Sequence, residues 1–109
     1  MAETRKILGQ AALPATTLTG VYTVPALTNT VVSSVVICNT SGANRTFRLS
    51  VAIAGAADTP AQYLYYNEDL PRDTSFVVTI GITLAAAAVI RAWASGVGVS
   101  VNVFGVETT

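Results

Sequence analysis

Alternation of apolar and polar residues at a period of two is the feature that most constrains this chain. Two segments, residues 46–53 and 97–104, keep this alternation through four repeats. Successive side chains of a strand point to opposite faces, so each segment presents one apolar face to a core. The apolar sets are Phe47, Leu49, Val51 and Ile53 in the first segment, and Val97, Val99, Val101 and Val103 in the second. The pattern predicts two half-buried strands.

Five further segments are rich in the valine, isoleucine, threonine and aromatic residues that favour strands. They are residues 17–24, 30–38, 62–66, 75–82 and 89–94. Turn-forming residues separate them, which is typical of an all-β antiparallel sandwich of jelly-roll or immunoglobulin-like type with about seven to eight strands. We expect a single β-sandwich domain over residues 16–109. Residues 1–15 are expected to form an N-terminal arm that becomes ordered on contact with a neighbour.

Two segments carry more specific expectations. Residues 30–38 are apolar at both odd and even positions, which favours a central strand that is covered on both sides. Residues 84–91 contain four consecutive alanines, and alanine is the best helix former. The run is short and flanked by β-branched residues, so strand–turn–strand is favoured over a short helical turn.

Composition excludes several classes of function. The chain has no histidine, one cysteine, and six basic residues against six acidic ones. Without histidine there is no Ser–His–Asp or Cys–His relay and no histidine metal ligand, and one cysteine cannot form an internal disulfide. A net charge of zero gives no electrostatic attraction for nucleic acid or an anionic membrane. We expect no enzymatic activity, no cofactor, no metal, and no binding to nucleic acid or membrane.

The low charge also bears on assembly. Charged residues make up 11% of the chain, against about 25% in a typical soluble domain. A small domain with so few charges leaves apolar surface open, and large apolar patches usually mark contacts with a partner. We therefore expect a homo-oligomer.

The first residues lack the apolar segment of a signal peptide, so we expect synthesis in a cytoplasm.

The aromatic residues are the main candidates for a binding surface. Gathered at one edge of a sandwich, Tyr63, Tyr65, Tyr66 and Trp93 would stack on a sugar or form an interface. In the alternative, Tyr63 and Tyr65 share one face of a strand and pack in the core, while Tyr66 lies outside. The residues that we predict at an interface are Tyr65, Tyr66, Asn67, Trp93 and Phe104.

Several polar residues have a structural and a functional interpretation. Cys38 is interpreted as a small apolar side chain at the end of a buried strand rather than a reactive thiol. The acidic loop at residues 67–73 is interpreted as a solvated turn rather than a Ca²⁺ site. Arg48 and Arg91 lie in apolar segments and are expected to pair with carboxylates. Glu107 is the expected carboxylate of a cross-strand or intersubunit bridge.

Seven segments in a fixed order and spacing carry a resemblance to known proteins. The segments are Lys6-Ile7-Leu8-Gly9-Gln10-Ala11-Ala12, Leu18-Thr19-Gly20-Val21-Tyr22-Thr23-Val24-Pro25, Val35-Val36-Ile37-Cys38-Asn39, Thr46-Phe47-Arg48-Leu49-Ser50-Val51, Gln62-Tyr63-Leu64-Tyr65-Tyr66, Ile80-Gly81-Ile82-Thr83-Leu84 and Phe104-Gly105-Val106-Glu107. They cover nearly the whole chain, and none of them is a catalytic motif. With these segments the chain resembles a family of small structural proteins of tailed bacteriophages.

The resemblance implies a virion component of β-sandwich type, assembled in the cytoplasm of a bacterial host. Such proteins decorate or cement a capsid or attach to a tail, which implies the phage major capsid or tail proteins as partners and a homo-oligomer, by analogy a trimer. The alternative is a receptor- or carbohydrate-binding adhesin displayed on the tail or fibres. In the first case Tyr66, Asn67 and Trp93 contact another subunit, and in the second they contact a glycan.

Overall fold

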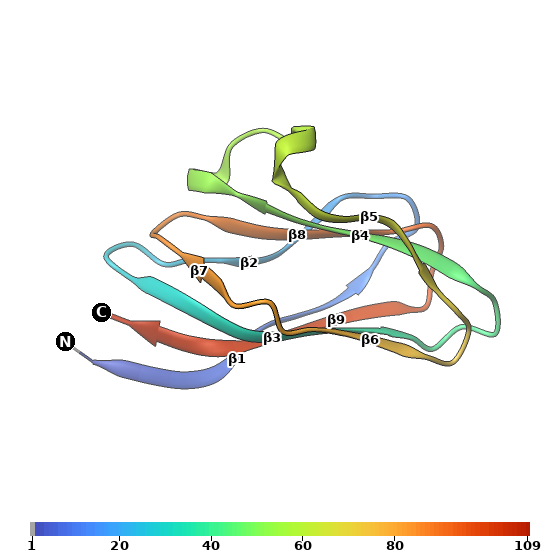
Figure 1. Ribbon diagram of the computed structural model, residues 1–109, viewed down its shortest axis with the longest axis horizontal. Coiled ribbons are helices and arrows are strands. Elements are labelled where there is room, and N and C mark those ends of the chain that lie inside the picture. The colour runs from blue at the N-terminus through green and yellow to red at the C-terminus, as the bar shows by residue number, and fades with distance from the viewer. Residues whose placement is uncertain (1) are drawn as a thin grey trace.

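The computed structural model describes residues 2–109 and arranges them as nine strands in two layers (Figure 1). The strands are β1 (Glu3–Leu13), β2 (Thr19–Thr23), β3 (Asn29–Asn39), β4 (Arg45–Ala52), β5 (Tyr63–Leu70), β6 (Ser75–Val78), β7 (Ile82–Leu84), β8 (Val89–Ala94) and β9 (Val99–Thr108). Two 3₁₀ turns, η1 (Ile53–Gly55) and η2 (Pro60–Gln62), lie in the connection from β4 to β5. Met1, the first residue of the predicted arm, lies outside the described residues.

The strands form two antiparallel sheets that pack face to face. One sheet has the order β1-β9-β3-β6, with β7 also paired to β3, and the other has the order β2-β8-β4-β5. When β6 and β7 are taken as two parts of one interrupted strand, this is the order of an eight-stranded jelly roll. The predicted all-β antiparallel sandwich is confirmed, and of the two predicted types the strand order is that of a jelly roll.

The N-terminal segment is an edge strand of the first sheet. Strand β1 pairs with β9 from Glu3 opposite Thr108 to Leu13 opposite Val99, and Leu13 is buried in the core. The predicted arm is therefore wrong for the described residues, because strand pairing and a buried leucine hold the segment within the fold. Two of its inward positions are Gly9 and Ala11, whose small side chains hid the alternation.

Strand β3 is not covered on both sides, because a bulge changes which positions face the core. The register of β3 with β9 shifts between Val32 and Ser34. Before the shift Val32 is buried and Val31 is 50% exposed, whereas after it Val35 and Ile37 are buried. One extra residue moves the alternation by one position, so an apolar run on a single face looks two-sided in the sequence.

Other strand boundaries differ from the predicted segments. Residues 75–82 are divided between β6 and β7, with Gly81 in a left-handed conformation between them (φ 72°). Strand β5 continues to Leu70, into the segment predicted as a loop, and the turn begins at Pro71. The alanine run is strand–turn–strand as predicted, since a turn over residues 85–88 connects β7 to β8.

Two residues of the predicted apolar faces lie outside the strands. Ile53 is 82% exposed in the turn η1, and Val97 is 62% exposed before β9 begins. Each lies just past an end of its alternating segment, where the chain leaves the sandwich. The predicted core position of both residues is therefore wrong.

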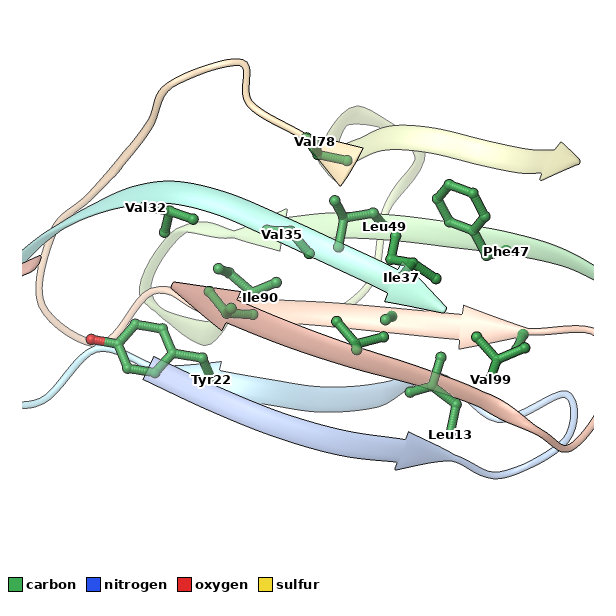
Figure 2. Close-up of a cluster of buried hydrophobic side chains, with 14 of the residues drawn as sticks. Leu13, Tyr22, Val32, Val35, Ile37, Phe47, Leu49, Val78, Ile90 and Val99 are labelled. Atoms are coloured by element: carbon green, nitrogen blue, oxygen red, sulfur yellow. The ribbon is translucent and has the colours of Figure 1, made fainter. Parts of the chain in front are cut away.

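The core lies between the sheets and consists mainly of aliphatic side chains (Figure 2). Phe47, Leu49 and Ile90 project from the second sheet, and Val35 and Ile37 from the first. All five are fully buried, and each such side chain stabilises the fold by about 1.5–3 kcal/mol through removal from water.

Within residues 2–109, no helical segment has the length and apolar character of a membrane-spanning helix.

Candidate functional site

The outer face of the β2-β8-β4-β5 sheet carries aromatic side chains around one arginine. We call Arg48, Tyr63, Tyr66, Asn67 and Trp93 the arginine cluster. Arg48 on β4 pairs in register with Trp93 on β8. Its guanidinium carbon lies 3.9 Å from the ring centre of Trp93 and 4.2 Å from that of Tyr66. A cation over an aromatic face is attracted by the ring quadrupole, so both rings hold the guanidinium in place.

Irregular pairing of β5 distributes its tyrosines between the two faces of the sheet. The register of β4 with β5 shifts twice, so that Tyr65 lies opposite Leu49 and Tyr63 lies opposite Ser50. Tyr65 therefore faces the core, whereas Tyr63 lies on the outer face and packs edge-on against Tyr66, with 5.0 Å between ring centres. The prediction that Tyr63 shares the core face of Tyr65 is wrong, because the shift separates them.

Hydrogen bonds fix the polar ends of the cluster. The side-chain oxygen of Asn67 accepts a bond of 2.7 Å from Arg48 Nε. Asn67 has a φ of 52°, in the left-handed region that asparagine tolerates better than most residues. The hydroxyl of Tyr63 donates to Asp58 at 3.0 Å. Burial, followed by this bond to a carboxylate, raises the pKa of Tyr63 above its ordinary value.

The connection from β4 to β5, residues 53–62, forms one wall of a pocket beside the cluster. Arg91 donates to the carbonyl oxygens of Ala56 at 2.9 Å and Gly55 at 3.2 Å, and Gln62 donates to that of Ala57 at 2.8 Å. The bonds from Arg91 on β8 tie the connection to the sheet, and the bond from Gln62 lies within the connection, which is above β4 and β5 in Figure 1. The pocket has a volume of about 510 Å³. Its lining residues are Arg48, Asp58, Thr59, Pro60, Tyr63 and Tyr66.

The structure brings together three of the five predicted interface residues. Tyr66, Asn67 and Trp93 all belong to the arginine cluster. Tyr65 instead packs inward against Phe47 and Phe76, and Phe104 lies on β9 of the other sheet. These two residues are therefore not part of one surface with the other three.

The predicted carboxylate partners of Arg48 and Arg91 are wrong. Arg48 bonds to an amide and stacks on rings, and Arg91 bonds to backbone carbonyls. Within residues 2–109 neither lies within ion-pair distance of a carboxylate. Asp58, which the sequence did not single out, faces the pocket through its bond to Tyr63. An isolated arginine among strand residues was the available signal, and only the strand pairing identifies what it contacts.

The outer face of the β1-β9-β3-β6 sheet is a second exposed surface. Its apolar side chains, which we call the valine face, are Ile7, Val31, Val36, Val77, Phe104 and Val106. Ile7, Val31 and Val77 are each at least half exposed, and Phe104 is partly buried beside them. The strand pairing places charged side chains of this face, Glu3 and Arg5, near one end of β1.

The remaining polar candidates lie at separate places in the fold. Glu107 forms the predicted bridge, in cross-strand form, with 2.9 Å between its carboxylate and Lys6 Nζ. Cys38 is a partly buried free thiol near the end of β3. Glu68 and Asp69 lie on β5 rather than in a loop, and Asp73 lies in the following turn. No group of three or more potential metal ligands is found in residues 2–109.

Comparisons of the chain with protein-family models, with curated proteins and with solved structures give no match. The resemblance to phage structural proteins therefore depends on the sequence segments alone. Two surfaces remain as candidates for function: the arginine cluster with its pocket on one sheet, and the valine face on the other.

Proposed function

We propose that the chain is a non-enzymatic structural component of a bacteriophage virion, which decorates or cements the particle through subunit contacts. The observation that carries the proposal is the valine face, because exposed apolar surface with few charges favours burial against protein. The sequence resemblance supplies the phage context. A jelly roll is compatible with this function, since the fold occurs in viral capsid proteins, but it also occurs in lectins and cupins.

The valine face suits contact with another copy of the chain or with a shell protein. Two apolar faces approach without repulsion between like charges, and Glu3 and Arg5 lie near one end of the face. We propose a homo-oligomer, a trimer by analogy with viral accessory β-sandwiches. Each contact need be only modest in strength, because a repeating lattice multiplies weak contacts into stable attachment.

The proposal is tested with Val77→Asp, which adds a charge to the valine face at a side chain that is 57% exposed. Val97→Asp adds the same charge at a turn residue that is 62% exposed, and it serves as the matched control. Sedimentation velocity is expected to give an oligomer for the wild type and Val97→Asp, and a monomer for Val77→Asp. A monomeric wild type, or the same state for both variants, would contradict the proposal.

Attachment to the particle is tested by washing purified virions in molar salt. Burial of apolar surface is little affected by ionic screening, so the wild-type chain is expected to remain bound and to protect the particle against heat. Val77→Asp is expected to be released. Loss of the wild-type chain at moderate salt would contradict attachment by the valine face.

A second candidate function is a receptor- or carbohydrate-binding adhesin displayed on the virion. It is favoured by a separate observation, the pocket beside the arginine cluster, which combines tyrosine rings with Arg48 and Asp58. Particles that lack the chain distinguish the two functions. Reduced heat resistance is expected for the structural component, whereas normal heat resistance with lost adsorption to cells is expected for the adhesin.

A further inference from the structure

Arg48 presents a fixed and unused positive charge to the pocket. Its Nε atom bonds to Asn67, and its plane is held by Tyr66 and Trp93. Its Nη atoms have no hydrogen-bond acceptor within residues 2–109, and no carboxylate lies within ion-pair distance. The free edge of the guanidinium, formed by its two Nη atoms, matches a carboxylate, and a guanidinium that is already oriented loses little conformational freedom on binding.

Asp58 provides a hydrogen-bond acceptor in the same pocket. One of its carboxylate oxygens accepts from Tyr63, and the other has no partner within residues 2–109. A free carboxylate oxygen accepts bonds from hydroxyl groups. Its negative charge also disfavours ligands with several negative charges, such as a phosphate dianion, in favour of a ligand with a single one.

The walls between these two groups are suited to a sugar ring. Tyr63, Tyr66 and Pro60 offer apolar surfaces for the C–H faces of a pyranose, and Thr59 offers a hydroxyl group. A volume of about 510 Å³ lies within the usual range for ligand pockets. The bonds from Arg91 and Gln62 hold the wall in place without ligand, so the pocket is already formed.

We infer that this pocket binds a saccharide that bears one carboxylate, with Arg48 holding the carboxylate and Asp58 accepting from a ring hydroxyl. The inference rests on the second candidate function and names its ligand class. It does not depend on the valine face, which lies on the other sheet.

The inference is tested by NMR titration of the intact chain with glucuronic acid. Glucose, which has the same ring but no carboxylate, is the uncharged control ligand. Glucuronic acid is expected to shift the amide signals of Arg48, Asp58 and Tyr66 and to bind at least about tenfold more tightly than glucose, because a carboxylate pairs with the guanidinium. Arg48→Gln is expected to remove this preference. Arg72→Gln, which makes the same change of charge in a turn outside the pocket, is expected to bind as the wild type.

Four further results decide the inference. Arg48→Lys keeps the charge without the fork, and an intermediate preference is expected. Equal binding of glucose and glucuronic acid would overturn the acidic ligand while leaving a carbohydrate-binding adhesin intact, whereas no saturable binding of either sugar would overturn both. Acetate that binds as tightly as glucuronic acid would overturn the role of the sugar ring.

Discussion

Tyr22 joins the two sheets at a buried polar contact. Its ring is 7% exposed on β2, and its hydroxyl donates to Glu107 on β9 at 2.6 Å and lies 2.8 Å from the hydroxyl of Thr30 on β3. The other carboxylate oxygen of Glu107 binds Lys6. Burial, followed by the hydrogen bond to Glu107, raises the pKa of Tyr22 to about 12. The bonds from Tyr22 and then Lys6 lower the pKa of Glu107.

Replacement of Tyr22 by phenylalanine is expected to destabilise the fold by about 1–3 kcal/mol, because it leaves an oxygen of the partly buried Glu107 carboxylate without its donor. Urea denaturation measures the change. Tyr66→Phe is the control, since that tyrosine is 59% exposed. The free energy of unfolding of this variant is expected to differ from that of the wild type by less than about 0.5 kcal/mol. Equal effects of the two variants would contradict a structural role for the Tyr22 hydroxyl.

Stability is expected to depend on pH through the same contact. The pKa of Tyr22 is raised from 10.0 to about 12 on folding, so its contribution is complete below pH 10 and is lost as pH rises towards 12. Over this range the free energy of unfolding of the wild type is expected to fall by about 3 kcal/mol more than that of Tyr22→Phe, measured by urea denaturation at several pH values.

At low pH, stability is expected to depend on Glu107, whose pKa is lowered on folding. The contribution of its carboxylate to stability is present above pH 4.5 and is lost as pH falls below that value.

At the scale of elements, β9 is the strand on which the first sheet depends. It pairs with β1 on one side and β3 on the other, and both pairings shift register beside Phe104. The pairing with β1 shifts between Val103 and Phe104, and the pairing with β3 shifts between Phe104 and Gly105. Gly105 follows directly. A Cβ atom there would meet the backbone oxygen of Val31 and the side chain of Leu8. The two bulges bring the neighbouring strands β1 and β3 so close to β9 that only glycine fits at position 105.

Gly105→Ala is therefore expected to destabilise the fold by about 2–3 kcal/mol, since backbone atoms of a paired strand cannot move aside cheaply. Gly42→Ala is the matched control, because a Cβ atom at that loop position meets no atom within 4 Å. Thermal and urea unfolding of the two variants measure the difference. Similar stability of both variants would show that β3 and β9 can separate without cost.

At the scale of the whole molecule, the two ends of the chain lie side by side (Figure 1). The backbone of Ala2 and that of Thr109 exchange two hydrogen bonds, of 3.1 and 2.9 Å. The first strand thereby covers the edge of the last one along its length. The first sheet is completed at its β1 edge by pairing between the residues farthest apart in the sequence.

Deletion of residues 1–15 is expected to abolish cooperative unfolding, because it removes β1, exposes the edge of β9 and deletes the buried Leu13. Circular dichroism followed through a urea titration measures this loss. Deletion of residues 1–2 is the control and is expected to leave a cooperative transition. A folded protein that begins at residue 16 would restore the prediction of a detachable arm.

The fold class and most of the strands could be predicted from the amino-acid sequence, because the alternation of side chains is a local property of an extended backbone. It also identified Tyr66, Asn67 and Trp93 as residues of one surface. Strand β1 was missed because small residues occupy inward positions such as Gly9, where the backbone of β1 lies close to that of β2 in the other sheet.

The face of the sheet that several side chains occupy could not be predicted, because it depends on how the strands pair in three dimensions. The bulge in β3 and the shifts in β5 depend on the partner strand, so the sequence of one strand does not indicate that Val31 faces outward or that Tyr63 and Tyr65 are separated. The same holds for Arg48, whose contacts come from two other strands, β5 and β8. Pairing between distant segments sets register, and register sets the chemistry of each face.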